Sequence, residues 1–358
     1  MSATEETVGT SGSRLGAAVN RVVPRPAVYK RRQRESWLVG IALAAIVPMF
    51  VHGFYGMDVA NKAMIFIVLA TGFYIQFALS GQFSLATSAF YATGAFTSAW
   101  AGEKVGGFLV GLVVGAIVAG LLGAVLKALL QRSPLLQFAI ATLSFAALVQ
   151  IIFREWESFT GGGAGKVGIP SPSILGKTFI TPTEVFYVSA AVALVGVGLL
   201  ILLERSATQR DWTFVRDMST VARVSGLPTT WIQITAFGVG AAFMGAAGAL
   251  TAYSRHFVDL SQFSAVISLD VLIMVLLGGS RSLWGPAVGA IVLTLLPEWL
   301  RDLKDYKDLV YAGLILVVIL LIPEGLTSVP RRIFVALTKG RRKGSVASTA
   351  TLPGEAQP

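Results

Sequence analysis

A glycine cluster beside a lysine, FTGGGAGKVGIP at residues 159–170, is the stretch that most resembles a phosphate-binding loop. Gly163, Gly165 and Gly168 satisfy the G-x-G-x-x-G spacing, and Gly165-Lys166 resembles the end of a P-loop. Such loops hold phosphate oxygens with backbone N–H groups at the start of a helix. The pattern therefore raises the question of whether this chain binds a nucleotide.

The residues around this stretch argue against a nucleotide site. A P-loop would need glycine in place of Thr160 and Ser or Thr in place of Val167, and both motifs should follow a β-strand. Here the preceding sequence, AIATLSFAALVQIIF, is a long apolar helix. We therefore predict a glycine-rich turn before the Pro170-Ser171-Pro172 stretch.

Other reactive groups are few. The chain has no cysteine, which excludes disulfides, thiol nucleophiles and Cys-ligated metals. Its two histidines, His52 and His256, are far apart and lack metal-ligand spacing. We predict no catalytic site, no metal site and no cofactor bound by this chain.

The composition indicates a membrane protein. Hydrophobic residues make up 54% of the 358 residues, charged residues make up 13%, and the mean hydropathy is +0.71. These values are too apolar for a water-soluble domain, so we predict an all-α, polytopic membrane helix bundle. The net charge of +10 fits a membrane surface better than nucleic acid, because the basic residues cluster at the two ends and beside apolar segments.

About ten segments approach the roughly 20 helical residues needed to cross a hydrocarbon core. They lie at about 37–54, 59–80, 83–101, 106–129, 135–153, 183–203, 231–253, 264–279, 283–300 and 308–323. The third, eighth and tenth fit the requirement least well. Small residues at helix-packing spacing, such as Gly285 and Gly289, favour packing within the bundle over a dimer seam.

Lys and Arg set the orientation, because positive charge is retained in the cytoplasm. The two basic tails, 1–35 and 326–358, are then cytoplasmic and disordered, and they flank a transmembrane domain at 36–325. Loop 204–230 is cytoplasmic, and loop 154–182 is extracytoplasmic. The predicted turn glycines of this outer loop are Gly161, Gly162, Gly165 and Gly168.

The third segment is unusually polar for a lipid-facing helix. Its polar residues are Gln82, Ser84, Thr87, Ser88, Thr93, Thr97 and Ser98. The segment should therefore face protein or a water-filled path, and hydrogen bonding between helices and a translocation role fit equally well.

Asp270 is the one carboxylate well inside a predicted apolar segment. It is a functional candidate, although its place in the outer part of the helix also permits snorkelling. The candidate path residues are Gln82, Ser84, Ser88, Tyr91 and Asp270.

The cytoplasmic loop 204–230 contains an amphipathic pattern. Apolar residues recur at near-helical spacing between Trp212 and Val224, and Gly226 with Pro228 should stop the helix. Such a helix either lies on the membrane surface or docks into a partner, and the pattern alone favours the surface.

Four blocks in order also resemble a known family. They are GQFSLATSAFYATGAF, FAIATLSFAALVQIIFREWESFTGGGAGKVGIP, GLPTTWIQITAFGVGAAFMGAAGAL and SLDVLIMVLLGGSRSLWGPAVGAIVLTLLPEWL. Over about residues 40–325 the chain resembles permease subunits of ATP-binding cassette (ABC) importers for branched-chain amino acids. It is most similar to the M-type subunits of LIV systems, and the family also includes urea and amide permeases.

The resemblance implies a larger assembly in the cell inner membrane. A second permease, forming a homodimer or heterodimer, would stand beside this chain. Two cytoplasmic subunits would bind ATP and Mg²⁺, and an extracytoplasmic binding protein would deliver the substrate. The chain itself would be a transport subunit rather than an enzyme.

The resemblance also implies that RDMSTVARVSGLP is the coupling segment, which overturns the preference for a surface helix. The implied coupling residues are Arg216, Asp217, Ala222, Arg223, Gly226 and Pro228. Arg223 stands where the family usually has an acidic residue, and Val221 replaces an alanine, which suggests an ATPase partner of compensating acidity. Asp270 stands where the family commonly has an acidic residue.

We therefore expect an ATP-driven importer half for branched-chain or related amino acids. A urea or amide permease of the same family is one alternative. An ion-coupled secondary transporter is another, but one carboxylate and no convincing repeat speak against it.

Overall fold

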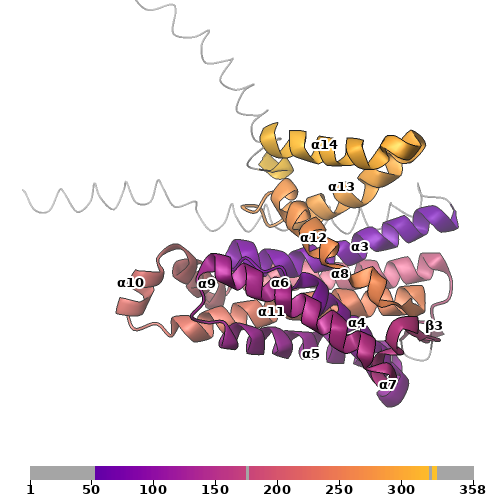
Figure 1. Cartoon of the computed structure of the whole chain (residues 1–358), viewed down its shortest axis with the longest axis horizontal. Helices are drawn as coiled ribbons and strands as arrows, with labels where there is room; N and C mark the ends of the chain where they lie inside the picture. The colour runs from indigo at the N-terminus through magenta and orange to yellow at the C-terminus, as the bar shows by residue number, and fades with distance from the viewer. Residues whose placement is uncertain (1–52, 175–176, 322–324, 329–358) are drawn as a thin grey trace, which may run out of the picture. The chain divides into compact units, whose positions relative to one another are not determined.

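The computed structural model describes residues 53–174, 177–321 and 325–328 of the chain (Figure 1). The predicted tails and most of the first segment, 37–54, lie outside these residues. The long helices are α3 (Phe54–Tyr74), α4 (Thr87–Ala101), α5 (Gly107–Leu129), α6 (Leu135–Glu155), α8 (Pro182–Arg205), α9 (Ala207–Asp217), α11 (Thr229–Arg255), α12 (Ala265–Gly278), α13 (Gly285–Trp299) and α14 (Lys307–Leu321). Within the described residues, each of the other nine predicted segments coincides with a helix, so the all-α membrane bundle is confirmed.

The described part of the chain contains five helical runs long and apolar enough to cross a membrane, and shorter apolar helices follow them. One run, Thr87–Leu129, is 43 residues long, but positive φ angles at Gly106 (116°) and Gly107 (79°) reverse the chain inside it. Its halves, α4 and α5, pack antiparallel, since Gly111 lies against Ser98 and Gly115 against Gly94. The run is therefore two spans, as the sequence predicts.

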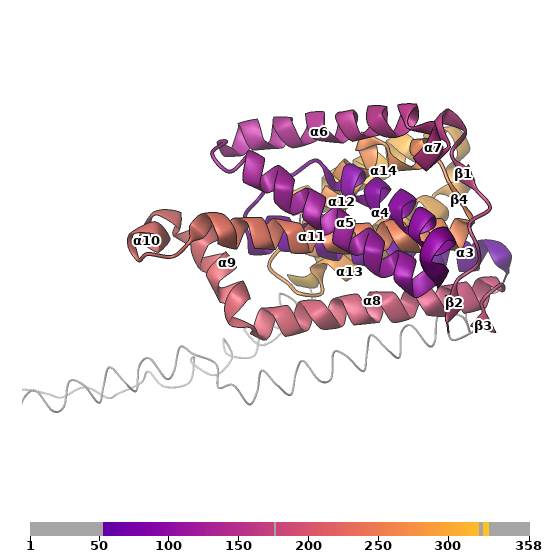
Figure 2. The same cartoon turned by 90° about the horizontal axis from the view of Figure 1, so that it is seen from below.

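Helix α11 is the centre of the bundle and packs against α3, α4 and α5 (Figures 1 and 2). These helices approach through glycine. A Cβ atom added to Gly94 would lie 2.1 Å from the carbonyl oxygen of Gly245, and one added to Gly248 would lie 2.1 Å from that of Tyr91. In lipid no water-driven force holds helices together, so such close backbone contact supplies the packing energy.

Small residues also join the last helices. A Cβ added to Gly289 on α13 would lie 1.8 Å from the carbonyl oxygen of Met274 on α12. A Cβ added to Gly285 would lie 2.1 Å from the carbonyl oxygen of Gly279, which directly follows α12. The predicted use of these residues for packing inside the bundle is confirmed.

The polar third segment starts with an interruption rather than a helix. After α3 a π turn (Ile75–Leu79) ends at Ser80, and the chain is non-helical until α4 begins at Thr87. The Gln82 side chain donates to the carbonyl of Gln233 at 3.0 Å, and the Leu85 N–H donates to the Thr142 hydroxyl at 3.0 Å. Non-helical backbone at membrane depth is tolerated where protein satisfies its polar groups in this way.

The polar side chains of this segment are all buried in protein, as predicted. Several satisfy backbone groups nearby: Thr93 donates to the Ala89 carbonyl at 2.8 Å, and Ser98 to the Ala95 carbonyl at 2.9 Å. Ser84 accepts from the Ala86 N–H at 3.2 Å. Much of the segment's polarity is therefore used in local hydrogen bonds.

The glycine-rich stretch is a turn, and it follows helix α6. It contains the short helices α7 (Glu157–Thr160) and η3 (Gly162–Ala164), then strand β1 (Lys166–Val167), which pairs antiparallel with β4 (Phe257–Val258). The four predicted turn glycines all have φ between 61° and 81°. Lys166 forms an ion pair with Glu103 at 2.8 Å, so its ammonium group already has a carboxylate partner. This geometry confirms the turn and fits no phosphate cradle.

Close glycine packing generates a stability prediction. We expect Gly94→Ala to lower the free energy of unfolding by about 1–3 kcal/mol, because the new methyl group overpacks the contact with Gly245. The measurement is denaturant or thermal unfolding in detergent. Gly313→Ala on α14 is the matched control, since a Cβ there meets nothing within 4 Å. An equal effect of the two substitutions would contradict the packing account.

Candidate coupling surface and charged cavity

The segment predicted as one amphipathic helix is two helices, so that prediction was wrong in detail. Helix α9 ends at Asp217, and α10 (Ser219–Val224) begins after Met218, whose φ and ψ of −138° and 55° are not helical. The break arises because α9 buries Trp212 and Val215 in the bundle, which sets its direction before α10 starts. The apolar residues of the segment therefore lie on two different surfaces: these two side chains of α9 are buried in the bundle, and Val221 and Val224 of α10 are exposed.

Helix α10 lies beyond the ends of the long helices in both views (Figures 1 and 2). Its Ala222 is fully buried, whereas Met218, Val221 and Val224 are 55%, 51% and 86% exposed. These three side chains, at a spacing of three residues, form what we name the α10 ridge. An exposed apolar ridge at the end of a membrane bundle is a candidate contact surface.

The end of α10 is fixed as the sequence predicts. The Leu227 N–H donates to the Ala222 carbonyl, and the Gly226 N–H donates to the Arg223 carbonyl, both at 3.1 Å. With Gly226 at φ 79°, these bonds make a Schellman motif. Pro228 then precedes the first residue of α11.

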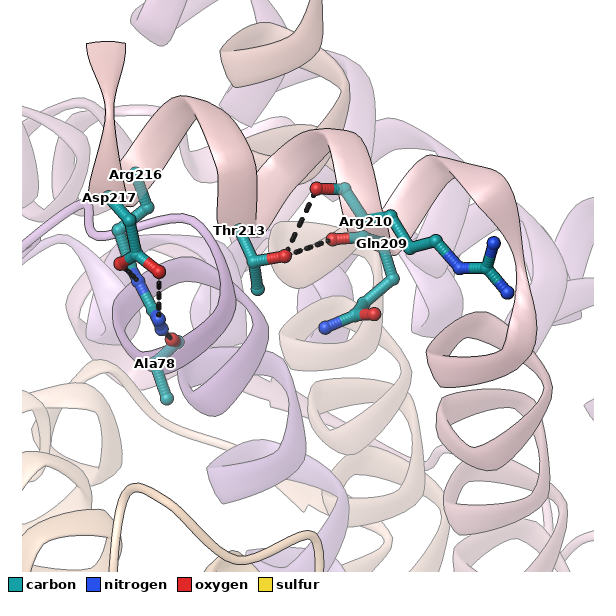
Figure 3. A network of polar contacts seen from close by, with 6 residues as sticks. All are labelled: Ala78, Gln209, Arg210, Thr213, Arg216 and Asp217. Atoms are coloured by element: carbon teal, nitrogen blue, oxygen red, sulfur yellow. Dashed lines mark hydrogen bonds and ion pairs between the residues drawn. The ribbon is translucent and has the colours of Figure 1, made fainter. Parts of the chain in front are cut away.

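The side chain of Arg216 reaches back to the end of α3, although it remains 36% exposed (Figure 3). Its guanidinium donates to the carbonyl of Ala78, in the π turn after α3, and to both carboxylate oxygens of Asp217, at 2.8 and 3.2 Å. These hydrogen bonds from Arg216 hold the pKa of the Asp217 carboxyl below its ordinary value. A Cβ added to Gly81 would lie 2.5 Å from Cγ of Arg216, so α9 rests directly on the start of the interrupted segment.

The predicted coupling residues thus divide into three groups. Arg216, Asp217 and Ala222 hold the segment to the bundle or within itself, whereas Arg223 is exposed beside the α10 ridge. Gly226 and Pro228 shape the return into α11.

A cavity of about 310 Å³ lies between α3, α4, α11, α12, α13 and α14. Two of the predicted path residues, Tyr91 and Asp270, line it. Gln82, Ser84 and Ser88 do not. They are buried near the interruption, where the Ser88 N–H bonds the Ser268 hydroxyl at 3.0 Å.

Charged residues surround the opening of this cavity. Asp58 and Arg255 form an ion pair at 3.9 Å, and Glu298 accepts a hydrogen bond from Tyr55. Asp58 is in the first turn of α3, while Arg255 ends α11, so this rim lies at the opposite end of the bundle from α10.

Residues 56–321 match the family model of the branched-chain amino acid transport system permease component. The chain belongs to this permease family.

Two relatives of this permease are high-affinity branched-chain amino acid transport system permease proteins LivM, from Salmonella typhimurium and Escherichia coli. Each is 30% identical over 339 residues, which cover 88% of this chain and 80% of the relative. No solved structure matches the permease. The family resemblance stated from the sequence is confirmed, and the permease is a multi-pass membrane protein.

Sequence reasoning missed most of the residues that line the cavity in this permease, among them Asn61 and Lys62 on α3. Lys62 lies inside the predicted segment 59–80, about 12 Å along α3 from Phe54 at about 1.5 Å per residue, and a lysine within a predicted span is itself a signal of function. Lys127 on α5 is different, because its ammonium lies 4.4 Å from the Phe138 ring centroid and reaches no described cavity.

The Schellman motif gives a test of how α10 ends. We expect Gly226→Val to unravel its last turn, because a β-branched residue disfavours positive φ. Hydrogen exchange measured by mass spectrometry should then be faster over residues 219–228. Gly163→Val is the control, because the φ angle of Gly163 is not positive and a Cβ atom there would meet nothing within 4 Å. Unchanged exchange in Gly226→Val would contradict the motif's role.

Proposed function

We propose that this chain is a permease subunit of an ABC importer in the cell inner membrane, moving branched-chain or related amino acids into the cytoplasm. Both termini and α10 are cytoplasmic in this proposal, and the glycine-rich loop is extracytoplasmic. A second permease completes the path, two ATPase subunits bind ATP and Mg²⁺, and a binding protein delivers the substrate. The names of the LivM relatives support this substrate class.

The observation that carries the proposal is the α10 ridge. Ala222 is fully buried, whereas Val221 and Val224 present exposed apolar side chains at the end of the bundle. Apolar anchors on one short helix suit docking into a groove of a partner protein. In the proposed importer that partner is the ATPase subunit.

Arg216 supplies the link from this surface to the membrane interior. It joins α9 to the Ala78 carbonyl, and the chain continues from there through the interrupted segment into α4. Closure of the ATPase subunits would push α10, and a rigid α9 would pass the displacement to this segment. The bundle would then switch between outward and inward access.

Charged substitutions in the α10 ridge test whether the ATPase subunits dock there. We expect Val221→Asp with Val224→Asp to abolish co-purification of the ATPase subunits, because two carboxylates would be desolvated in an apolar groove. The matched control is Val167→Asp, an exposed valine in β1 at the other end of the bundle. Retained co-purification of the double variant would contradict docking through α10. Absence of any ATPase from the wild-type chain would favour an ion-coupled transporter.

Loss of the Arg216 link should uncouple transport from hydrolysis. With Arg216→Gln we expect ATPase subunits to remain bound, but the ratio of leucine imported to ATP hydrolysed to fall about tenfold, the scale of one charge-assisted hydrogen bond. Proteoliposome uptake and phosphate release measure the two rates. Arg216→Lys should fall between, because it keeps the charge without the planar fork. A wild-type ratio in Arg216→Gln would exclude this transmission route.

A further inference from the structure

The cavity between α3, α4, α11, α12, α13 and α14 holds charges that its rim does not neutralise. At about 310 Å³ it is near the lower limit of roughly 300–1,000 Å³ for small-molecule pockets. At the rim, Asp58 and Arg255 form an ion pair and neutralise each other's charge. Further along α3 and α12, Lys62, which is exposed, and Asp270, which is half-buried, line the same space from different helices.

Lys62 and Asp270 line the same cavity but form no ion pair within 4.0 Å in the described structure. The Lys62 ammonium lies 5.5 Å from the Phe66 ring centroid. Charges inside a membrane bundle are costly unless they are paired or serve a ligand. A cation and an anion held apart on opposite helices are complementary to a ligand that carries one charge of each sign.

A third group in the cavity also lacks a partner. Asn61 is only 6% exposed, and its Oδ1 atom accepts no hydrogen bond. A buried amide oxygen without a donor costs free energy, so its presence beside the cavity indicates an absent donor. An ammonium group is such a donor.

We propose that this cavity binds the head group of a free, zwitterionic α-amino acid. Lys62 holds the α-carboxylate, while Asp270 and Asn61 hold the α-ammonium. The aliphatic side chain packs against Ile65, Met274 and Leu293, which line the same space. This assignment rests on the proposed importer function and narrows it, because urea and simple amides carry neither charge and could not satisfy both Lys62 and Asp270.

The test is binding of radiolabelled leucine to the permease in nanodiscs, purified with the subunits that accompany it and without binding protein. Competitors are leucinamide, which lacks the carboxylate, 4-methylpentanoate, which lacks the ammonium, and urea. Unlabelled leucine should displace the label at about tenfold lower concentration than either analogue, the effect of one charge-assisted hydrogen bond, and urea should not compete.

Two substitutions assign the charges. Lys62→Met should remove the preference for leucine over leucinamide and keep the preference for leucine over 4-methylpentanoate. Asp270→Asn should remove the preference over 4-methylpentanoate and keep the preference over leucinamide. Lys62→Arg, which keeps the charge if the methionine variant fails to assemble, should retain both preferences. Lys104→Met and Glu155→Gln are matched controls at positions that do not line the cavity and should behave as wild type.

Other outcomes overturn the assignment. If Lys62→Met weakens binding of all the ligands equally, Lys62 has a structural role. If both variants keep both preferences, or if urea displaces leucine, the head group binds elsewhere. If ATPase subunits co-purify in these cases, the importer function stands and only this site falls. If none accompany the wild-type chain, the importer function itself fails.

Discussion

The close backbone approach of α11 to α3, α4 and α5 is the contact on which the rest of the bundle depends. Gly94, Gly245 and Gly248 leave no room for a side chain at these crossings. Tight packing here lets protein surround the non-helical segment before α4, where exposed backbone in lipid would be prohibitive. It also fixes the position of α11, whose first residues follow the candidate coupling surface and whose last residues line the charged cavity.

Both ends of α11 bear on the proposed mechanism. Near its start, the carbonyls of Gln233 and Phe237 accept hydrogen bonds from Gln82 at 3.0 Å and Gln76 at 2.9 Å. Near its end, Thr251 bonds Tyr91 at 2.5 Å, and both line the charged cavity. In the proposed importer, displacement of α9 therefore has two short routes to the cavity, one along α11 and one through the interrupted segment into α4.

Local signals in the sequence predicted much of this arrangement. Apolar length located nine helices of the described residues, the polar residues marked a segment enclosed by protein, and Gly226 with Pro228 ended α10 where the structure ends it. Tertiary contacts decided the rest. The break at Met218 follows from burial of Trp212 and Val215 on α9, and Arg216 bonds the Ala78 carbonyl in the π turn, 138 residues away in the sequence. Lys62 and Asp270 line one cavity from helices about 200 residues apart, which no local pattern encodes.

The central claim, that α10 docks on a cytoplasmic ATPase subunit, can be tested most directly by site-specific crosslinking. The chain has no cysteine, so Val224→Cys provides one attachment point for a photoreactive label, and Trp299→Cys, at the other end of the bundle, provides the control. The account predicts an adduct with the ATPase subunit, identified by mass spectrometry, from position 224 and none from position 299. An ATPase adduct from position 299, or only lipid adducts from position 224, would contradict it.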